Sequence, residues 1–257
     1  MENVLDSLQT SKPFQNPQSL NGGLFVGRLK EVRPFGGLMF QAFGVHGPEL
    51  TPFADMVIDL LLVSLAFALL IGTPRTSKYD IALLATFVVS VTALRVLLQP
   101  VPNVQPVTVA ALLVGAQLGA RRGVAFAVLV TLLSNALIGD GWWTLFQAIG
   151  WGAVAVIGSQ INFGTVEQFH SGRLYIAAVA SAFLFDFIAS LSIYSPGMTL
   201  GEFAVYLAHG LPFDILHALG NLTFAVWFGH FVFRTLETID SLEQLERAVV
   251  EDNVVNG

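Results

Sequence analysis

Apolar residues group into seven stretches along the chain, separated by short segments rich in glycine, proline or charge. The stretches cover residues 53–72, 81–98, 107–120, 124–138, 144–160, 174–194 and 211–233. A helix needs about 20 mostly apolar residues to cross the hydrocarbon core of a bilayer. Most stretches approach that length, whereas 107–120 and 124–138 are short for a full span. The pattern predicts an all-α integral membrane protein embedded in a lipid bilayer.

The composition agrees with this prediction and excludes several kinds of site. Hydrophobic residues make up 54% of the 257 positions and charged residues only 12%, about half the charge of a soluble domain. The chain has no cysteine, so disulfides and cysteine-ligated metal sites are excluded. The net charge is −6 and the end of the chain is acidic, so we expect no polybasic lipid patch there and no nucleic-acid partner.

The segment before the first apolar stretch has two interpretations. Residues 1–21 are polar, and residues 22–45 mix apolar with basic positions. The mixed part fits either an amphipathic piece on the membrane surface or a flexible linker. No charged start leads into an apolar run, so we expect no cleavable signal peptide.

Basic residues alternate between the connections and predict the orientation. Lys and Arg occur after the first, third, fifth and seventh stretches, and are absent from the other connections, 100–106, 139–143 and 195–210. Positive loops face the cytoplasm, so we expect a multi-pass protein of the cell membrane with a cytoplasmic C-terminus. Seven spans would place the N-terminus outside, an assignment that its basic residues oppose: Arg28, Lys30 and Arg33.

A tryptophan-rich turn between two apolar stretches is the first candidate site. Three of the four Trp residues lie within ten positions, next to an acidic residue between two glycines. Such rings suit either an aromatic belt at the membrane surface or a small-molecule pocket, and the neighbouring acid and amide favour the pocket. The candidates are Asp140, Trp142, Trp143, Gln147 and Trp151.

Further polar residues flank the apolar stretches on the same predicted outer side. They are Asn103 and Gln105 in a proline-rich loop, Asn135 at the end of residues 124–138, and Asp214, His217 and Asn221 on one face of the last stretch. Asp214 and His217 offer too few ligands for a metal site, so we expect a hydrogen bond between them. Arg95 is either a pocket cation or a snorkelling anchor, and its position in the outer half of its stretch favours an internal ion pair with an Asp.

Small residues form a stripe at four-residue spacing, made of Ala111, Gly115 and Gly119. Such stripes let helix backbones approach closely in lipid. The stripe serves either packing within the chain or contact with a partner. The chain lacks the G-x-S-x-G, H-E-x-x-H and P-loop motifs, so we expect no enzyme, no ATP hydrolysis by this chain, no cofactor and no metal.

Taken together, several motifs resemble the substrate-binding S component of energy-coupling factor (ECF) transporters. They are LRVLLQPVPNVQPVT at 94–108, the glycine-bounded segment 115–123, Ser134-Asn135, GDGWWTLFQAIGWG at 139–152 and LPFDILHALGN at 211–221. The resemblance implies a six-helix S-component-like bundle plus one extra N-terminal helix. Its divisions would be a polar or amphipathic region (1–50), an extra transmembrane helix and loop (51–79), a six-helix substrate-binding domain (80–235) and an acidic cytoplasmic tail (236–257).

The same resemblance implies partners and a ligand. An ECF T subunit and two cytosolic ATPase subunits would supply energy, and the ligand would be a vitamin or related micronutrient, with cobalamin as one candidate. The loop 99–106 would close over this ligand, and the stripe of Ala111, Gly115 and Gly119 would face the T subunit. The extra first stretch and the absence of an Ala-x-x-x-Ala pattern in 81–98 depart from the family. The alternatives are an intramembrane enzyme using Asp186, Asp214 and His217, or a membrane adaptor without a ligand.

Overall fold

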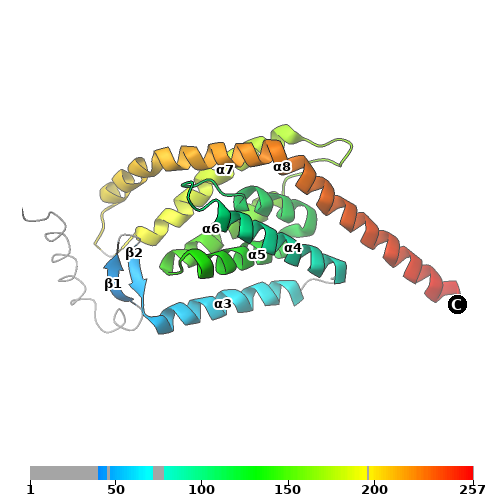
Figure 1. Cartoon of the computed structure of the whole chain (residues 1–257), viewed down its shortest axis with the longest axis horizontal. Coiled ribbons are helices and arrows are strands. Elements are labelled where there is room, and N and C mark those ends of the chain that lie inside the picture. Colours follow the sequence, from blue (N-terminus) through cyan, green and yellow to red (C-terminus); the bar gives the residue numbers. More distant parts are fainter. Residues whose placement is uncertain (1–39, 45–46, 72–77, 196, 257) are drawn as a thin grey trace, which may run out of the picture.

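The computed structural model describes residues 40–44, 47–71, 78–195 and 197–256 (Figure 1). Its elements are β1 (Phe40–Gly44), β2 (Gly47–Leu50), α3 (Pro52–Ile71), α4 (Lys78–Leu97), α5 (Val107–Ile138), α6 (Trp142–Gly158), α7 (Ser171–Ser190), the short 3-10 helix η2 (Leu191–Ile193) and α8 (Leu200–Asn256). The expectations for residues 1–39, including those for Arg28, Lys30 and Arg33, lie outside the described residues.

The described chain is helical apart from one antiparallel hairpin of β1 and β2. The predicted all-α class holds for the membrane-embedded part, and the short hairpin, which was not predicted, precedes the first of these helices. Four helices are, by length and composition, apolar enough to cross a membrane: Pro52–Ile71, Val107–Ile138, Ser171–Ile193 and Leu200–Glu237. Large apolar side chains remain exposed on α3 and α8, as expected where lipid replaces water. The protein is a multi-pass helical membrane protein.

Helix α5 reverses its direction within its length. Gly119 has a φ of 83°, a conformation that glycine adopts without the steric cost of a Cβ atom. A Cβ placed on Gly123 would lie 2.8 Å from the Cα of Gly115, although residues eight apart in a straight helix are separated by about 12 Å. The two halves of α5 therefore lie against each other, and its 32 residues do not form one continuous straight span.

The small-residue stripe packs inside the protein. Ala111 has no exposed surface, and a Cβ on Gly115 would overlap the carbonyl oxygen of Ala155 in α6. A Cβ on Gly158 of α6 would likewise overlap the carbonyl of Leu112. Gly119 is exposed at the reversal. The prediction that this stripe faces a partner is therefore wrong for Ala111 and Gly115, because the space above them is filled by α6.

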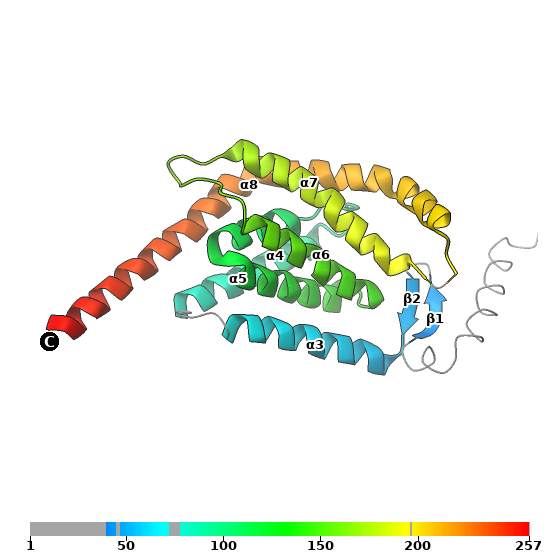
Figure 2. The same ribbon diagram turned by 180° about the vertical axis from the view of Figure 1, so that it is seen from behind.

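The outer helices lie on opposite sides of α5 and α6. Both views show α3 along one side and the pair of α7 and α8 along the other (Figures 1 and 2). Leu62 and Ala66 of α3 pack in one apolar cluster with Ala125 and Val128 of α5. The end of α8 projects away from the other helices (Figure 2). The backbone of the predicted tail is helical as far as Asn256.

Helix α8 begins earlier than the apolar pattern indicates. We predicted a connection over residues 195–210, but the helix starts at Leu200. The side chain of Glu202 accepts a hydrogen bond from the backbone N–H of Thr199 (2.7 Å), and the Thr199 hydroxyl accepts one from the N–H of Glu202 (3.2 Å). This reciprocal cap stabilises the first turn. The early start adds helical turns beside the segment that contains Asp214.

Candidate functional site

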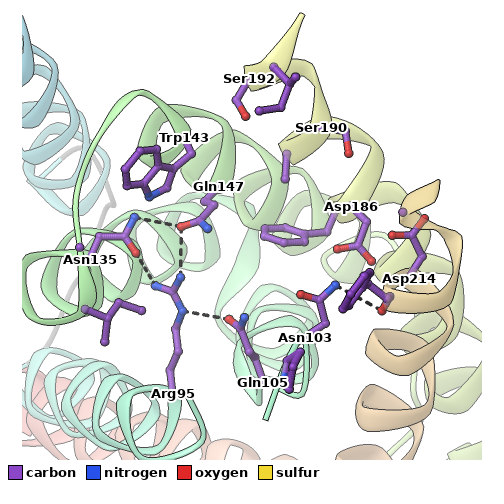
Figure 3. A pocket seen from close by; sticks show the side chains of 18 of the residues that line it. Arg95, Asn103, Gln105, Asn135, Trp143, Gln147, Asp186, Ser190, Ser192 and Asp214 are labelled. Carbon is purple, nitrogen blue, oxygen red and sulfur yellow. Dashed lines mark hydrogen bonds between the residues drawn. The ribbon is translucent and has the colours of Figure 1, made fainter. Parts of the chain in front are cut away.

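A cavity of about 630 Å³ lies at one end of the helices. The loop after α4, the start of α6, the end of α7 and the first half of α8 surround it (Figure 3). Its volume falls within the range of drug-sized ligand sites, roughly 300–1,000 Å³. Six of the residues predicted to bind a substrate line it: Asn103, Gln105, Asn135, Trp143, Gln147 and Asp214.

Arg95 organises one wall of this cavity. Its Nε donates to Oε1 of Gln105 (2.9 Å), and its Nη2 donates to Oε1 of Gln147 (3.1 Å). Its Nη1 donates to Oδ1 of Asn135 (2.8 Å) and to the hydroxyl of Ser134. Asn135 also donates to Oε1 of Gln147 (2.9 Å). The guanidinium thus joins α4, the second end of the proline-rich loop, α5 and α6 in one hydrogen-bonded cluster (Figure 3).

The partners of Arg95 are all neutral. Its side chain is only 3% exposed, and within the described ranges no carboxylate forms an ion pair with it. The predicted internal ion pair with an Asp is therefore wrong, because amide and hydroxyl oxygens from α5, α6 and the loop occupy the positions around the guanidinium. The guanidinium also lies 4.8 Å from the ring centre of Trp151, a favourable cation–π distance. A buried cation without a carboxylate partner is costly and points to a functional role.

A second buried cluster lies behind the opposite wall. Nδ1 of His217 contacts both carboxylate oxygens of Asp186, at 3.0 and 2.9 Å, and its Nε2 lies 3.1 Å from the hydroxyl of Thr108. Nε1 of Trp151 donates to the same hydroxyl at 3.1 Å. We predicted that His217 pairs with Asp214, and this is wrong: the ring turns toward α7 and meets Asp186.

The proline-rich loop is attached to α8 beside the cavity. Nδ2 of Asn103 donates to the backbone carbonyl of Phe213 at 3.2 Å. Asn103 has a φ of 56°, a left-handed conformation that Asn tolerates better than most residues. Gly220 lets the loop approach α8, because a Cβ there would lie only 3.3 Å from Val104. Two contacts from different parts of α8 thus hold the loop at the cavity.

Five predicted binding residues do not line the cavity. Trp151, His217 and Asn221 are buried below it, and Nδ2 of Asn221 donates to the carbonyl of Ala178 (3.2 Å). Trp142 packs edge-on against Phe146, with ring centres 5.2 Å apart. Asp140 accepts hydrogen bonds from the backbone of Gly141 (2.8 Å) and the hydroxyl of Thr144, so it holds the turn before α6.

Asp140 also belongs to the group of described residues whose geometry could hold a metal ion. Carboxylate oxygens of Asp55, Asp59 and Asp140 all lie within 4.8 Å of one another. Oxygen ligands of this kind suit hard divalent cations. The three side chains are partly exposed and lie where the start of α3 meets the turn before α6, outside the cavity lining. The cluster therefore lies between α3 and the turn before α6.

Several cavity residues were not assigned to the site from the sequence. Arg95 was considered as a pocket cation and Asp186 as part of the alternative enzyme, but neither was assigned to the substrate-binding site, and the serines and aromatic residues at the junction of α7 and α8 were not considered. For Tyr206 in the first turns of α8, the sequence signal was the Thr199–Glu202 cap, because this cap starts the helix before the apolar stretch. The additional lining residues include Phe185, Ser190, Ser192, Tyr206 and Phe213.

Comparison of the sequence with known protein families gives a match, which covers the residues around the cavity. The model of a family of unknown function, DUF6580, matches residues 75–242. The chain belongs to this family. The matched region runs from α4 through most of α8, so it includes every residue of the cavity lining and leaves out the hairpin and α3. No curated protein and no solved structure matches the chain.

Proposed function

We propose that this member of DUF6580 is a membrane-embedded substrate-binding subunit of an ECF-type importer, which captures a vitamin or related micronutrient. The observation that carries the proposal is the cluster of Arg95, Gln105, Asn135 and Gln147 at a cavity of about 630 Å³. A concave site with a few convergent polar groups is the usual form of a small-molecule site. Its volume favours a compact ligand over one as large as cobalamin.

The distribution of basic residues supports an outward-facing cavity. Arg173 donates to the carbonyl of Asn162 (2.7 Å), and Asn162 lies in a surface depression with Gln117, close to the reversal in α5. Two connections without Lys or Arg, 100–106 and 139–143, contribute to the cavity lining at the opposite end through Pro102, Asn103, Gln105 and Gly139. Under the positive-inside rule, this distribution favours a cavity that faces the outside of the cell membrane and a cytoplasmic C-terminus.

The proposed transport role requires partner subunits. The chain has no P-loop motif, so ATP would be hydrolysed by two cytosolic ATPase subunits joined through an ECF T subunit. The predicted T-subunit stripe is buried, so the contact requires another surface. The exposed apolar residues of α3 and α8 offer membrane-facing surfaces for such a partner.

An intramembrane enzyme is the alternative, and the arrangement of Thr108, His217 and Asp186 gives it a specific form. The order hydroxyl, imidazole and carboxylate is that of a nucleophile–base–acid triad. However, Thr108 has no exposed surface, His217 is 2% exposed, and Trp151 already donates to the Thr108 hydroxyl. A substrate carbonyl has no access to this hydroxyl. These contacts favour a structural role for the triad-like cluster and a binding role for the cavity.

Ligand titration of the full chain in nanodiscs tests the proposal. Trp143 lines the cavity, whereas Trp227 is 73% exposed on the outer face of α8. We expect one member of a vitamin panel, which includes cobalamin, to change tryptophan fluorescence saturably after inner-filter correction. The change should shrink strongly in Trp143→Phe and persist in the control Trp227→Phe. A response that is flat throughout, or equal in both variants, would contradict a ligand at this cavity.

Co-purification from native membranes tests the partner part of the proposal separately. A tagged full-length chain should retain an ATPase and a T-like membrane protein in stoichiometric amounts. Saturable ligand binding without any ATPase in the purified complex would support a binding protein and contradict an ECF assembly. Product formation from the bound ligand, lost in Thr108→Val, would support the enzyme instead.

A further inference from the structure

The two sides of the cavity have opposite hydrogen-bonding character. Gln105 and Gln147 turn their amide oxygens to Arg95, since an amide N–H facing a guanidinium N–H would be repelled. Their amide nitrogens therefore remain as donors, and no other hydrogen bond is formed by either nitrogen in the part of the chain that the structure describes. Arg95 retains one further N–H on Nη2. This wall, the donor wall, offers hydrogen-bond donors around a positive charge.

The other side offers acceptors. Asp186 and Asp214 both line the cavity, from α7 and α8, and Figure 3 shows them on the side away from Arg95. Asp214 is half-buried and makes no hydrogen bond with the described residues. We call Asp186 and Asp214 the acceptor wall. A carboxylate accepts through several lone pairs, so the contact with His217 leaves Asp186 further capacity toward the cavity.

The buried cluster behind the acceptor wall is satisfied when His217 is neutral. Trp151 donates to the Thr108 oxygen, the Thr108 hydroxyl donates to Nε2 of His217, and Nδ1–H of His217 donates to Asp186. Each donor then has an acceptor. In this tautomer His217 adds no positive charge, so the negative charges of Asp186 and Asp214 face the cavity without compensation from the histidine.

We propose that the cavity binds a compact zwitterion whose carboxylate meets the donor wall and whose protonated amine meets the acceptor wall. The inference rests on the proposed substrate-binding role and gives its ligand a chemical class. Charges in a poorly solvated site are stabilised best by opposite charges with matching hydrogen bonds. A simple anion leaves the two aspartates unpaired, and a simple cation leaves Arg95 without a counter-charge.

The test uses simple probes with the full chain in nanodiscs. The probes are straight-chain ω-aminocarboxylates of increasing length, each with the alkyl carboxylate and the alkylamine of the same length. Thermal unfolding at millimolar probe concentrations is the measurement. We expect at least one ω-aminocarboxylate to raise the unfolding midpoint more than either singly charged analogue, with a Kd about tenfold lower or better, as expected for one added charge-assisted hydrogen bond.

Two substitutions separate the walls. Asp214→Asn should remove the advantage of the ω-aminocarboxylate over the alkyl carboxylate, without unfolding the protein, because Asp214 makes no hydrogen bond with the described residues. Gln147→Glu keeps the side-chain size and places a carboxylate beside Arg95, so it should weaken carboxylate-bearing probes about tenfold and leave the alkylamine unaffected or tighter. Glu167→Gln, which removes an exposed carboxylate away from the cavity lining, should change nothing.

The outcomes distinguish this inference from the proposed function. Equal binding of the alkyl carboxylate and the ω-aminocarboxylate, unchanged in Asp214→Asn, overturns the zwitterion but leaves a substrate-binding site for anions. No stabilisation by any probe, combined with saturable binding of a vitamin lacking an amine, overturns the zwitterion alone. No stabilisation by the probes and no response to the vitamin panel would overturn both.

Discussion

The interior of this protein contains two regions built by different means, the glycine contact between α5 and α6 and the polar cavity at one end of the same helices. At the contact, Gly115 and Gly158 bring backbone against backbone, so no side chain separates the helices. At the cavity, Arg95, Asn135 and Gln147 connect α4, α5 and α6 through side-chain hydrogen bonds. Close packing has little capacity to adjust, whereas hydrogen-bonded side chains around a cavity can exchange partners. The glycine contact is therefore suited to support the helices, and the hydrogen-bonded cavity is suited to bind and release a ligand.

The largest loss of stability is expected at the glycine contact. Gly115→Ala places a methyl group on the carbonyl of Ala155, and overpacking against backbone should lower the free energy of unfolding by about 3 kcal/mol. The matched control is Gly172→Ala, because a Cβ at Gly172 meets nothing within 4 Å. Thermal unfolding in nanodiscs measures both. Equal midpoints for the two variants would contradict the close contact of α5 with α6.

Removal of the cavity cation should cost less stability but more binding. Arg95→Met removes the donor of four hydrogen bonds, and we expect a loss of about 2 kcal/mol together with loss of saturable ligand binding. Arg173→Met is the control, since Arg173 donates to one exposed carbonyl at the other end. Tryptophan titration and thermal unfolding on the same samples separate the two effects. Wild-type affinity in Arg95→Met would refute the assigned role of the guanidinium.

The cluster beneath the cavity should show a smaller effect. Thr108→Val keeps the shape of the side chain but removes the partner of Trp151 and His217, so we expect a loss of about 1 kcal/mol. The ligand affinity should change little, because Thr108 is buried and does not line the cavity. Thr223→Val, whose hydroxyl bonds only its own helix at Leu219, is the control. Abolished binding in Thr108→Val would contradict a purely structural role for Thr108.

In the loop beside the cavity, the change in stability should be no larger than that at Thr108. Asn103→Ala loses the bond to Phe213 and keeps a positive φ that Ala disfavours, so we expect a loss of about 1 kcal/mol. Asn103→Gly loses the same bond without that strain and should cost about half as much. Both should accelerate ligand dissociation in stopped-flow measurements. Dissociation at the wild-type rate in both variants would contradict a covering role for the loop.

The helices could be located from the sequence because long apolar stretches in a membrane protein have few alternative structures. The predicted span 53–72 corresponds to α3 at Pro52–Ile71. The start of α8 was missed because residues 195–210 contain no long apolar stretch. The local signal for the helix start is instead the cap formed by Thr199 and Glu202. The hairpin of β1 and β2 was missed because its segment is too short and mixed to show a strand pattern.

The site could be predicted in part, because polar residues in an apolar chain are few and face the interior or a cavity. Their pairing could not be predicted. Spacing along one helix favoured His217 with Asp214, whereas the packing of α7 on α8 brings Asp186 to the ring. Arg95 contacts Asn135 and Gln147, which are distant in sequence. The sequence therefore did not reveal that the hydrogen-bond partners of Arg95 are uncharged.

The neutral surroundings of Arg95 also have an electrical consequence. A guanidinium paired with a carboxylate moves as a neutral unit, but this one carries a full elementary charge within its cluster. Moving one such charge across a membrane potential of 100 mV involves about 2.3 kcal/mol. Any displacement of the Arg95 cluster along the membrane normal therefore performs work against the cell's voltage, in proportion to the part of the field that it crosses.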